Sequence, residues 1–413
     1  MSEQRRSTVV LLGTLDTKGK EYAFIRDCLH EQDIDTLLVD VGVIGAPQVQ
    51  PDISNEAVAR AVGYNIEDLI AAGDRGAAIR AMAAGATAIV KQLYSANRLD
   101  GILGLGGSGG TALVTQAMRE LPVGVPKLMV STMASGETRP YVGAVDITMM
   151  YSVVDIAGIN ALSARILGNA AGAIAGMVET STLMHAAARP EDKPLVGATM
   201  FGVTTPAVEA GRERLEALGY EVLVFHATGT GGQSMEALIK DGFISAAFDL
   251  TTTELADDLV GGVLSAGPNR LEAAGEIGIP QVVSLGALDM VNFGPKASVP
   301  DKFSDRLLYE HNPTVTLMRT TAEECAELGR RIAAKLNRAK GPVTLFIPLK
   351  GVSAIDQVGQ PFYDPEADRV LIKALRETID DHVVDVREVD AHINDPAFAE
   401  AMADRLHELY QQR

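Results

Sequence analysis

The residues best suited to chemistry form a glycine run that follows a short apolar segment. Residues 104–111 read GLGGSGGT, and residues 112–118 continue with helical spacing. A strand, a glycine turn and a helix in this order make a phosphate cradle, because glycines let backbone N–H groups approach an anion and the helix N-terminus adds partial positive charge. The alternative is a tight turn that serves only sheet packing. We favour a site for phosphate or another anion.

Neither standard nucleotide motif is complete in this run. Glycines at 104, 106 and 109 match the dinucleotide fingerprint, but the next predicted strand ends in Ser131-Thr132 instead of an acidic ribose ligand. The run also matches a P-loop, except that Gly110 occupies the lysine position and so removes the main charge on the β- and γ-phosphates. From these residues alone both interpretations stay open.

Polar turns after two other predicted strands belong to the same edge of the sheet, since ligands bind outside the carboxyl ends of parallel strands. In the turn after residues 8–13, Asp16 could hold Mg²⁺ through water and Lys18 could offset phosphate charge. For each residue taken singly, helix capping or turn chemistry is the alternative. The predicted nucleotide-binding residues are Gly13, Thr14, Asp16, Thr17, Lys18, Gly106, Gly107, Ser108, Gly109, Gly110, Thr111, Ser131, Thr132 and Ser135.

The second half of the chain has fewer residues suited to catalysis. The loop at 228–232 predicts a second anion cradle beside His226, and Lys350 follows a predicted strand. We take His226 and Lys350 as candidate catalytic residues, although a lone histidine is more often structural. The sequence has no Ser-His-Asp elbow, no His-Glu-x-x-His and no paired-cysteine metal motif, so acyl transfer and zinc chemistry have no support.

Short apolar runs alternate with helical patterns along the chain, which is typical of mostly parallel sheets. Residues 189–194 are charged and bracketed by prolines, as in a linker between domains. We therefore predict an α/β protein of two Rossmann-like domains, 1–188 and 195–413, each a mostly parallel sheet with helices on both faces. The predicted strands are 8–13, 35–41, 99–103, 127–131, 145–150, 195–202, 220–225, 243–250, 281–285, 343–347 and 383–386.

Composition narrows the classes of partner and the compartment. The 413 residues carry a formal net charge of −18, which disfavours nucleic acid and membrane surfaces as partners. Cys28 and Cys325 match no metal spacing and fit a reducing cytoplasm, and the polar N-terminus does not resemble a signal peptide. The apolar segment 156–188 carries glycines at four-residue spacing, which suits a buried helix at a domain or dimer contact.

Several longer motifs are spread along the chain. They are 13–18 (GTLDTK), 106–111 (GGSGGT), 141–160 (YVGAVDITMMYSVVDIAGIN), 202–205 (GVTT), 226–232 (HATGTGG), 249–254 (DLTTTE) and 347–351 (IPLKG). Together they resemble one family, the ATP-binding family of the plant tobamovirus-resistance protein and its mostly uncharacterised bacterial relatives. The resemblance covers nearly the whole chain. It implies two Rossmann-like domains, ATP on the N-terminal domain and a homodimer, and it favours a mononucleotide over a dinucleotide.

The expected function is thus a cytoplasmic, Mg²⁺-dependent ATP-binding protein, with a small-metabolite site in the cleft between the domains. If the protein is an enzyme, ATP-dependent phosphoryl transfer or activation of a small metabolite is the expected reaction. A non-catalytic, nucleotide-responsive binding protein is the alternative, because no committed nucleophile or base stands out. An NAD-dependent enzyme is a third reading, and it lacks the acidic ribose ligand.

Overall fold

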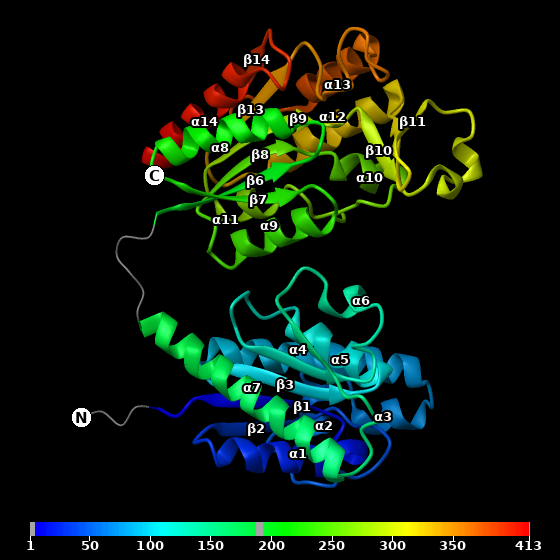
Figure 1. Cartoon of the computed structure of the whole chain (residues 1–413), viewed down its shortest axis with the longest axis vertical. Helices are drawn as coiled ribbons and strands as arrows, with labels where there is room; N and C mark the ends of the chain where they lie inside the picture. The colour runs from blue at the N-terminus through cyan, green and yellow to red at the C-terminus, as the bar shows by residue number, and fades with distance from the viewer. Residues whose placement is uncertain (1–4, 187–192, 413) are drawn as a thin grey trace. The chain divides into compact units, whose positions relative to one another are not determined.

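The computed structural model describes residues 5–186 and 193–412, and the chain forms two compact units (Figure 1). Unit 1 is Met1–Pro190 and unit 2 is Glu191–Arg413. Each unit is a parallel sheet covered by helices, which confirms the predicted α/β class with two Rossmann-like domains. Residues 189–192 of the predicted linker 189–194 lie outside the described residues.

Unit 1 has a five-stranded parallel sheet in the order β2-β1-β3-β4-β5. The chain runs to one side from β1 to β2 and then crosses to β3 on the other side. The order therefore reverses between β1 and β3, and this is the point where open α/β sheets bind ligands. The strands are β1 (Thr8–Gly13), β2 (Asp35–Asp40), β3 (Gly101–Gly106), β4 (Lys127–Ser131) and β5 (Thr148–Tyr151).

Alternate residues of β1 face the two helical layers of unit 1. Val10 and Leu12 pack with Met82 and Val114, whereas Leu11 packs on the other face against Ile174. Because both faces are buried, the strands are continuously apolar, as their sequences predict. The helices are α1 (Leu15–His30), α2 (Asn55–Arg60), α3 (Ile66–Ala71), α4 (Arg75–Ser95), α5 (Ser108–Met118), α6 (Arg139–Val142) and α7 (Ala161–Ala186).

Helix α7 is the long apolar helix expected from residues 156–188. By length and composition alone Ala161–Met184 could cross a membrane. Leu167, Ile174 and Val178 of this helix are buried in the core of unit 1.

Unit 2 repeats the arrangement with six parallel strands in the order β14-β13-β9-β8-β6-β7. Its strand order reverses between β6 and β8. A small antiparallel sheet, β10-β12-β11, follows β9 and was not predicted from the sequence. The strands are β6 (Leu195–Met200), β7 (Glu221–His226), β8 (Ala246–Thr251), β9 (Gln281–Gly286), β10 (Met290–Phe293), β11 (Leu308–Asn312), β12 (Val315–Arg319), β13 (Val343–Pro348) and β14 (Val384–Val389).

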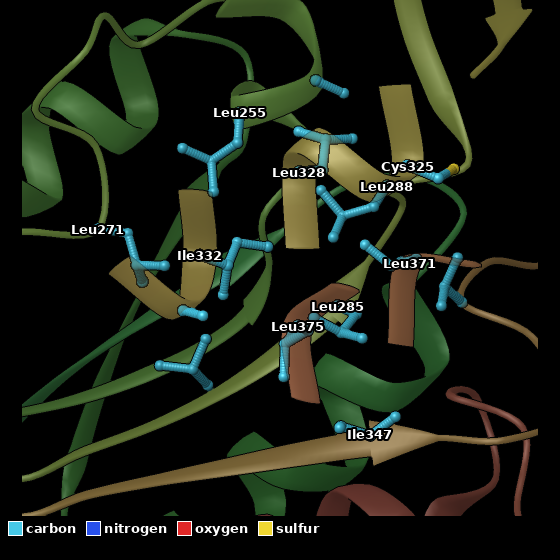
Figure 2. Close-up of a cluster of buried hydrophobic side chains, with 14 of the residues drawn as sticks. Leu255, Leu271, Leu285, Leu288, Cys325, Leu328, Ile332, Ile347, Leu371 and Leu375 are labelled. Carbon is cyan, nitrogen blue, oxygen red and sulfur yellow. The ribbon is translucent and has the colours of Figure 1, made fainter. Parts of the chain in front are cut away.

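Helices cover both faces of the larger sheet of unit 2. Figure 2 shows one core, where Leu328 and Ile332 of α12 lie beside Leu371 and Leu375 of α13 above the strands. The helices are α8 (Thr205–Ala217), α9 (Thr230–Lys240), α10 (Glu254–Val260), α11 (Ala273–Ile277), α12 (Ala322–Leu336), α13 (Pro365–Thr378) and α14 (Pro396–Gln411), with 3₁₀ turns η1 (Lys296–Ser298) and η2 (Asp301–Phe303).

Candidate functional site

A pocket of about 520 Å³ lies in unit 1 at the carboxyl ends of β1, β2 and β3. Its volume is in the range of pockets that take a small molecule. One wall is polar and comes from the turns after β1 and β3, together with Asp155. The other wall comes from the loop after β2 and from α3 and α4. It is mostly apolar and also carries Asp74 and Arg75 at the start of α4. The apolar lining residues are Val41, Val43, Ile44, Leu69, Ile70, Ala78, Ile79, Met82 and Leu113.

Tyr22 of α1 holds the two central strands apart at the base of this region. Regular pairing of β1 with β3 extends only to Leu12 and Gly104. Beyond it the Tyr22 hydroxyl donates to the Leu12 carbonyl at 2.6 Å and accepts from the Leu105 N–H at 2.8 Å. Burial raises the pKa of this phenol well above its usual range, so it stays protonated. A Cβ on Gly13 would collide with the Tyr22 ring, which gives Gly13 a packing role.

The glycine run forms the turn from β3 into α5. Gly107 precedes the helix, and no side chain caps the N-terminus of α5. The first N–H groups of a helix have no intrahelical acceptor, so those of Ser108, Gly109 and Gly110 are available at the pocket that these residues line. The lining also includes Gly106 and Gly107. These five predicted residues are therefore brought together at one helix N-terminus.

Gly106 and Gly107 are glycines for different reasons. A Cβ on Gly106 would lie 3.0 Å from the Gly110 backbone, so the turn itself needs a glycine there. Gly107 has φ −83° and ψ −160°, a conformation open to any residue. Its Cβ would meet only the Thr132 hydroxyl oxygen, at 3.7 Å. The fold does not require glycine at position 107, whereas a ligand that approaches the backbone would.

Five predicted residues lie outside the pocket lining, namely Gly13, which packs against Tyr22, and four residues near the glycine turn. Thr111 and Ser131 are fully buried, and their hydroxyl oxygens are 2.6 Å apart behind the glycine turn. The Ser131 hydroxyl also accepts from the Met133 N–H at 2.9 Å. This pair joins α5 to the end of β4. Thr132 and Ser135 follow in the next turn, where Ser135 is exposed.

The turn after β1 supplies four predicted residues to the pocket: Thr14, Asp16, Thr17 and Lys18. The hydroxyl oxygens of Thr14 and Thr17 are 2.8 Å apart. Lys18 interrupts α1 with φ −129° and ψ 21°. Its ammonium donates to the Ile156 carbonyl at 2.5 Å.

One carboxylate oxygen of Asp16 accepts hydrogen bonds and the other does not. Its Oδ2 accepts from the N–H groups of Ile44 and Gly45, at 2.8 and 3.2 Å, which fixes the loop after β2. Its Oδ1 is buried with no hydrogen-bond partner among the described residues. No cluster of three or more acidic, His or Cys side chains suited to a metal occurs in residues 5–186 and 193–412. A magnesium ion here would need ligand phosphates and water to complete its coordination, which is its usual mode.

Asp40 is an important residue that the sequence analysis missed. It ends β2 fully buried, and its Oδ1 accepts from the N–H groups of Leu15 and Gly42 at 3.0 and 2.9 Å. Burial raises the pKa of Asp40, against the effect of these two bonds. An acid at the end of the second strand would have been the signal, since such a residue binds ribose in dinucleotide folds. Here it fixes the turns after β1 and β2 and does not line the pocket.

The loop after β7 is an anion cradle, but its anion belongs to the chain. The Glu254 Oε1 accepts from the N–H groups of Gly229 and Gly232 at 2.7 and 3.1 Å. Arg270 donates to the Glu254 Oε2 at 2.7 Å and to both oxygens of Asp249 at 2.5 and 2.6 Å. Glu254 and Arg270 are buried. The backbone N–H groups of the loop predicted at 228–232 thus already bind Glu254, and Arg270 pairs with the same carboxylate.

The two catalytic candidates of unit 2 lie on its surface. His226 is exposed at the end of β7. Lys350 is exposed too, and its ammonium donates to the carbonyl and carboxylate of Asp390 at 3.0 and 2.9 Å. Both remain hypotheses.

A second buried charged cluster surrounds Arg319 in unit 2. Its guanidinium contacts Asp368 at 2.8 Å and Asp356 at 3.7 Å. Nearby, Asp289 accepts from the Ser353 hydroxyl at 2.7 Å through Oδ2. Within the described part of the chain, Oδ1 of Asp289 and Oδ1 of Asp356 are buried and accept no hydrogen bond, although Oδ1 of Asp356 is the atom 3.7 Å from the Arg319 guanidinium. Burial and the charge of Asp356 raise the pKa of Asp289 to about 8.

This shift predicts a pH dependence of stability. The folded pKa of Asp289 lies above the unfolded value of about 4, so the folded chain binds more protons between these values. Stability therefore falls as the pH rises through this window. Asparagine mimics the protonated acid. Between about pH 6 and about pH 8.5, the melting temperature of Asp289→Asn should therefore fall by about 2–4 °C less than that of wild type. Thermal unfolding followed by circular dichroism measures this. The half-exposed Asp404→Asn is the control, and equal losses in wild type and Asp289→Asn would contradict the prediction.

Comparisons with known proteins identify relatives over nearly the whole chain. Models of the N-terminal and C-terminal domains of the uncharacterised protein family UPF0261 match residues 7–183 and 193–410. A UPF0261 protein of Clostridium tetani is 56% identical over 401 residues, which cover 96% of this chain and 98% of that protein. The tomato ToMV resistance protein Tm-1(GCR237) is 47% identical over 339 residues, which cover 81% of this chain and 45% of that protein. The family resemblance drawn from the motifs is confirmed.

Among solved structures, a putative UDP-N-acetylglucosamine 2-epimerase from Listeria monocytogenes is 10% identical and aligns over 68% of this chain and 79% of that chain. Its TM-score is 0.21. A similarity at this level assigns no function.

Proposed function

We propose that this chain, which belongs to the uncharacterised protein family UPF0261, binds ATP in the pocket of unit 1. The observation that carries the proposal is the pairing of two features in one pocket at the strand switch point. The uncapped N-terminus of α5 suits phosphates, and the apolar wall suits a base. Ile44 and Ile70 line this wall although 77% and 52% of their surfaces are exposed, so a flat apolar ligand group would cover them.

The polar wall gives each phosphate-binding group a role. The N–H groups of Ser108, Gly109 and Gly110 would donate to phosphate oxygens, and Lys18 would add the positive charge that the lysine-free glycine run lacks. Asp16 has a free carboxylate oxygen that fits a magnesium ion held mainly by the phosphates. The ion would offset the charge of the triphosphate beside Asp16 and Asp155.

The same proposal includes a homodimer, as the resemblance implies, and a cytoplasmic location, which the two cysteines and the polar N-terminus favour. Helix α7 supports a second copy by one observation. A Cβ on Gly168, Gly172 or Gly176 would meet no atom within 4 Å, so this stripe leaves room for close approach of another backbone. Sedimentation of the full chain would measure the oligomeric state.

Calorimetric titration of the full chain with ATP and MgCl₂ tests the proposed site. We expect saturable binding of one ATP per chain, weaker binding when EDTA removes the metal, and weaker binding still of inorganic triphosphate or adenosine alone. NAD should compete poorly, because Asp40 is buried away from the pocket. Absence of binding heat for ATP with magnesium, confirmed by equilibrium dialysis, would refute the proposal. Assays for loss of ATP with candidate metabolites then separate an enzyme from a binding protein.

A further inference from the structure

Segment 152–160 joins β5 to α7 and borders the pocket through Asp155. Two hydrogen bonds tie it to α1. Lys18 donates to the Ile156 carbonyl at 2.5 Å, and the Gly158 N–H donates to the Glu21 carboxylate. The side chain of Ile156 is buried in the core between α1 and α7. The segment is therefore held at its middle by residues of α1, one of which also lines the pocket.

The start of this segment has an unfavourable backbone conformation. Val153 has φ +63°, a region that β-branched residues rarely adopt. The Val154 N–H donates to the Ser152 carbonyl at 2.7 Å, which closes a γ-turn around Val153. With positive φ at its centre this turn is the rare, strained form. Val153 is also 57% exposed, so burial of its side chain does not compensate. The contacts with α1 thus help to hold this conformation, together with the bonds from the Ser152 hydroxyl to the Val154 carbonyl at 2.7 Å and from the Ser163 hydroxyl to the Gly158 carbonyl at 3.1 Å.

Lys18 is placed to connect a ligand with this segment. An ammonium group has three donors, and the Ile156 carbonyl takes one of them. The pocket-facing position of Lys18 lets a second donor reach a phosphate while the first bond stays in place. A phosphate would fix the ammonium by a charge-assisted hydrogen bond and so strengthen its hold on the segment.

We propose that Lys18 couples phosphate binding in the pocket to the ordering of segment 152–160. This inference rests on the proposed phosphate site. Without ligand, the strained turn at Val153 opens readily. With phosphate bound, Lys18 holds Ile156, the segment closes against α1, and an exposed apolar surface becomes fixed. That surface consists of Val153, Val154 and Ile159. Lys18 is in this view a positioning residue, and the segment reports whether the pocket is filled.

Hydrogen exchange of the full chain, read by mass spectrometry, tests the coupling with inorganic triphosphate and MgCl₂ as the probe. At saturation, established by calorimetry, peptides that span 152–160 should exchange about tenfold more slowly, the effect of one charge-assisted hydrogen bond. Lys18→Met should still bind triphosphate at higher concentration, with no slowing in this segment. Lys18→Arg should restore part of the slowing. The exposed Lys20→Met, which is outside the pocket lining, should behave as wild type.

The outcomes separate the coupling from the site on which it rests. If the wild type binds neither ATP nor triphosphate, the proposed function and the coupling both fail. If triphosphate binds but exchange in 152–160 does not change, the coupling alone is overturned. Equal slowing in Lys18→Met and wild type overturns it as well. Circular dichroism of each variant shows whether it is folded. If Lys18→Met does not fold, the wild-type comparison still tests whether the segment is ordered by the ligand, and Lys18→Arg tests the role of the lysine.

Discussion

Replacing Gly107 by valine should weaken ATP-Mg binding by about 30- to 150-fold and leave unit 1 folded. The fold tolerates the change, because φ −83° and ψ −160° suit a β-branched residue and the nearest atom to the new Cβ is 3.7 Å away. The new side chain would instead occupy the space before the N-terminus of α5. Loss of one hydrogen bond from a backbone N–H to a charged phosphate costs about 2–3 kcal/mol, which corresponds to this loss of affinity.

A matched variant separates blocked binding from damaged folding. Gly136→Val makes the same change on an exposed turn of unit 1 outside the pocket lining, where the nearest atom to a Cβ is 3.8 Å away. Calorimetry should give it the affinity of wild type, and both variants should melt within about 2 °C of wild type. Unchanged ATP affinity in Gly107→Val would contradict the proposal that phosphate binds at the N-terminus of α5.

The polar half of the pocket could be predicted from the sequence, and the reason is the parallel sheet. Strands that run in the same direction bring the turns after them to one edge, so Thr14, Asp16 and Lys18 meet Gly107 and Ser108 although about 90 residues separate them. Each turn follows a short apolar run that is recognisable locally. The pairing of turns then follows from topology without knowledge of any side-chain contact.

The apolar half could not be predicted, because it depends on how α3 and α4 lie over the sheet. Leu69, Ile79 and Met82 become a wall only when α3 and α4 pack beside the loop after β2. The roles of Tyr22 and Asp40 were hidden for a similar reason. Each bonds backbone groups of a segment distant in sequence, and residue type alone does not reveal such a partner.

In unit 2 the sequence pattern predicts an anion-binding loop but does not reveal which anion binds there. The small-residue loop before α9 does bind a carboxylate through backbone N–H groups. Glu254 is 22 residues away from Gly232 in the chain and lies in a run of threonines that predicts nothing about this contact. The cradle became a candidate for an external anion because the sequence does not show that an internal one fills it.

Arg270→Met should destabilise unit 2 by about 3–5 kcal/mol, the cost of leaving buried charge uncompensated. Arg270 is fully buried and contacts Asp249, Glu254 and Glu236 at 2.5, 2.7 and 3.3 Å. Methionine fills much of the volume of arginine but donates no hydrogen bond, so three carboxylates would face one another without a cation. Burial already raises the pKa of Glu254. Loss of Arg270 would raise it further, so acidification should restore part of the lost stability by protonation.

Hydrogen exchange of peptides in β8 and β9 measures this loss in unit 2 separately from unit 1. Arg214→Met is the matched control, since Arg214 pairs with Asp404 at 2.7 Å while both side chains are nearly half exposed. Such surface pairs contribute about 0–1 kcal/mol. Equal effects of the two variants would mean that Arg270 does not neutralise the cluster. If Arg270→Met loses the same stability at acid and neutral pH, the loss comes from packing around Arg270. Unpaired carboxylates would instead give a smaller loss at acid pH, because protonation removes their buried charge.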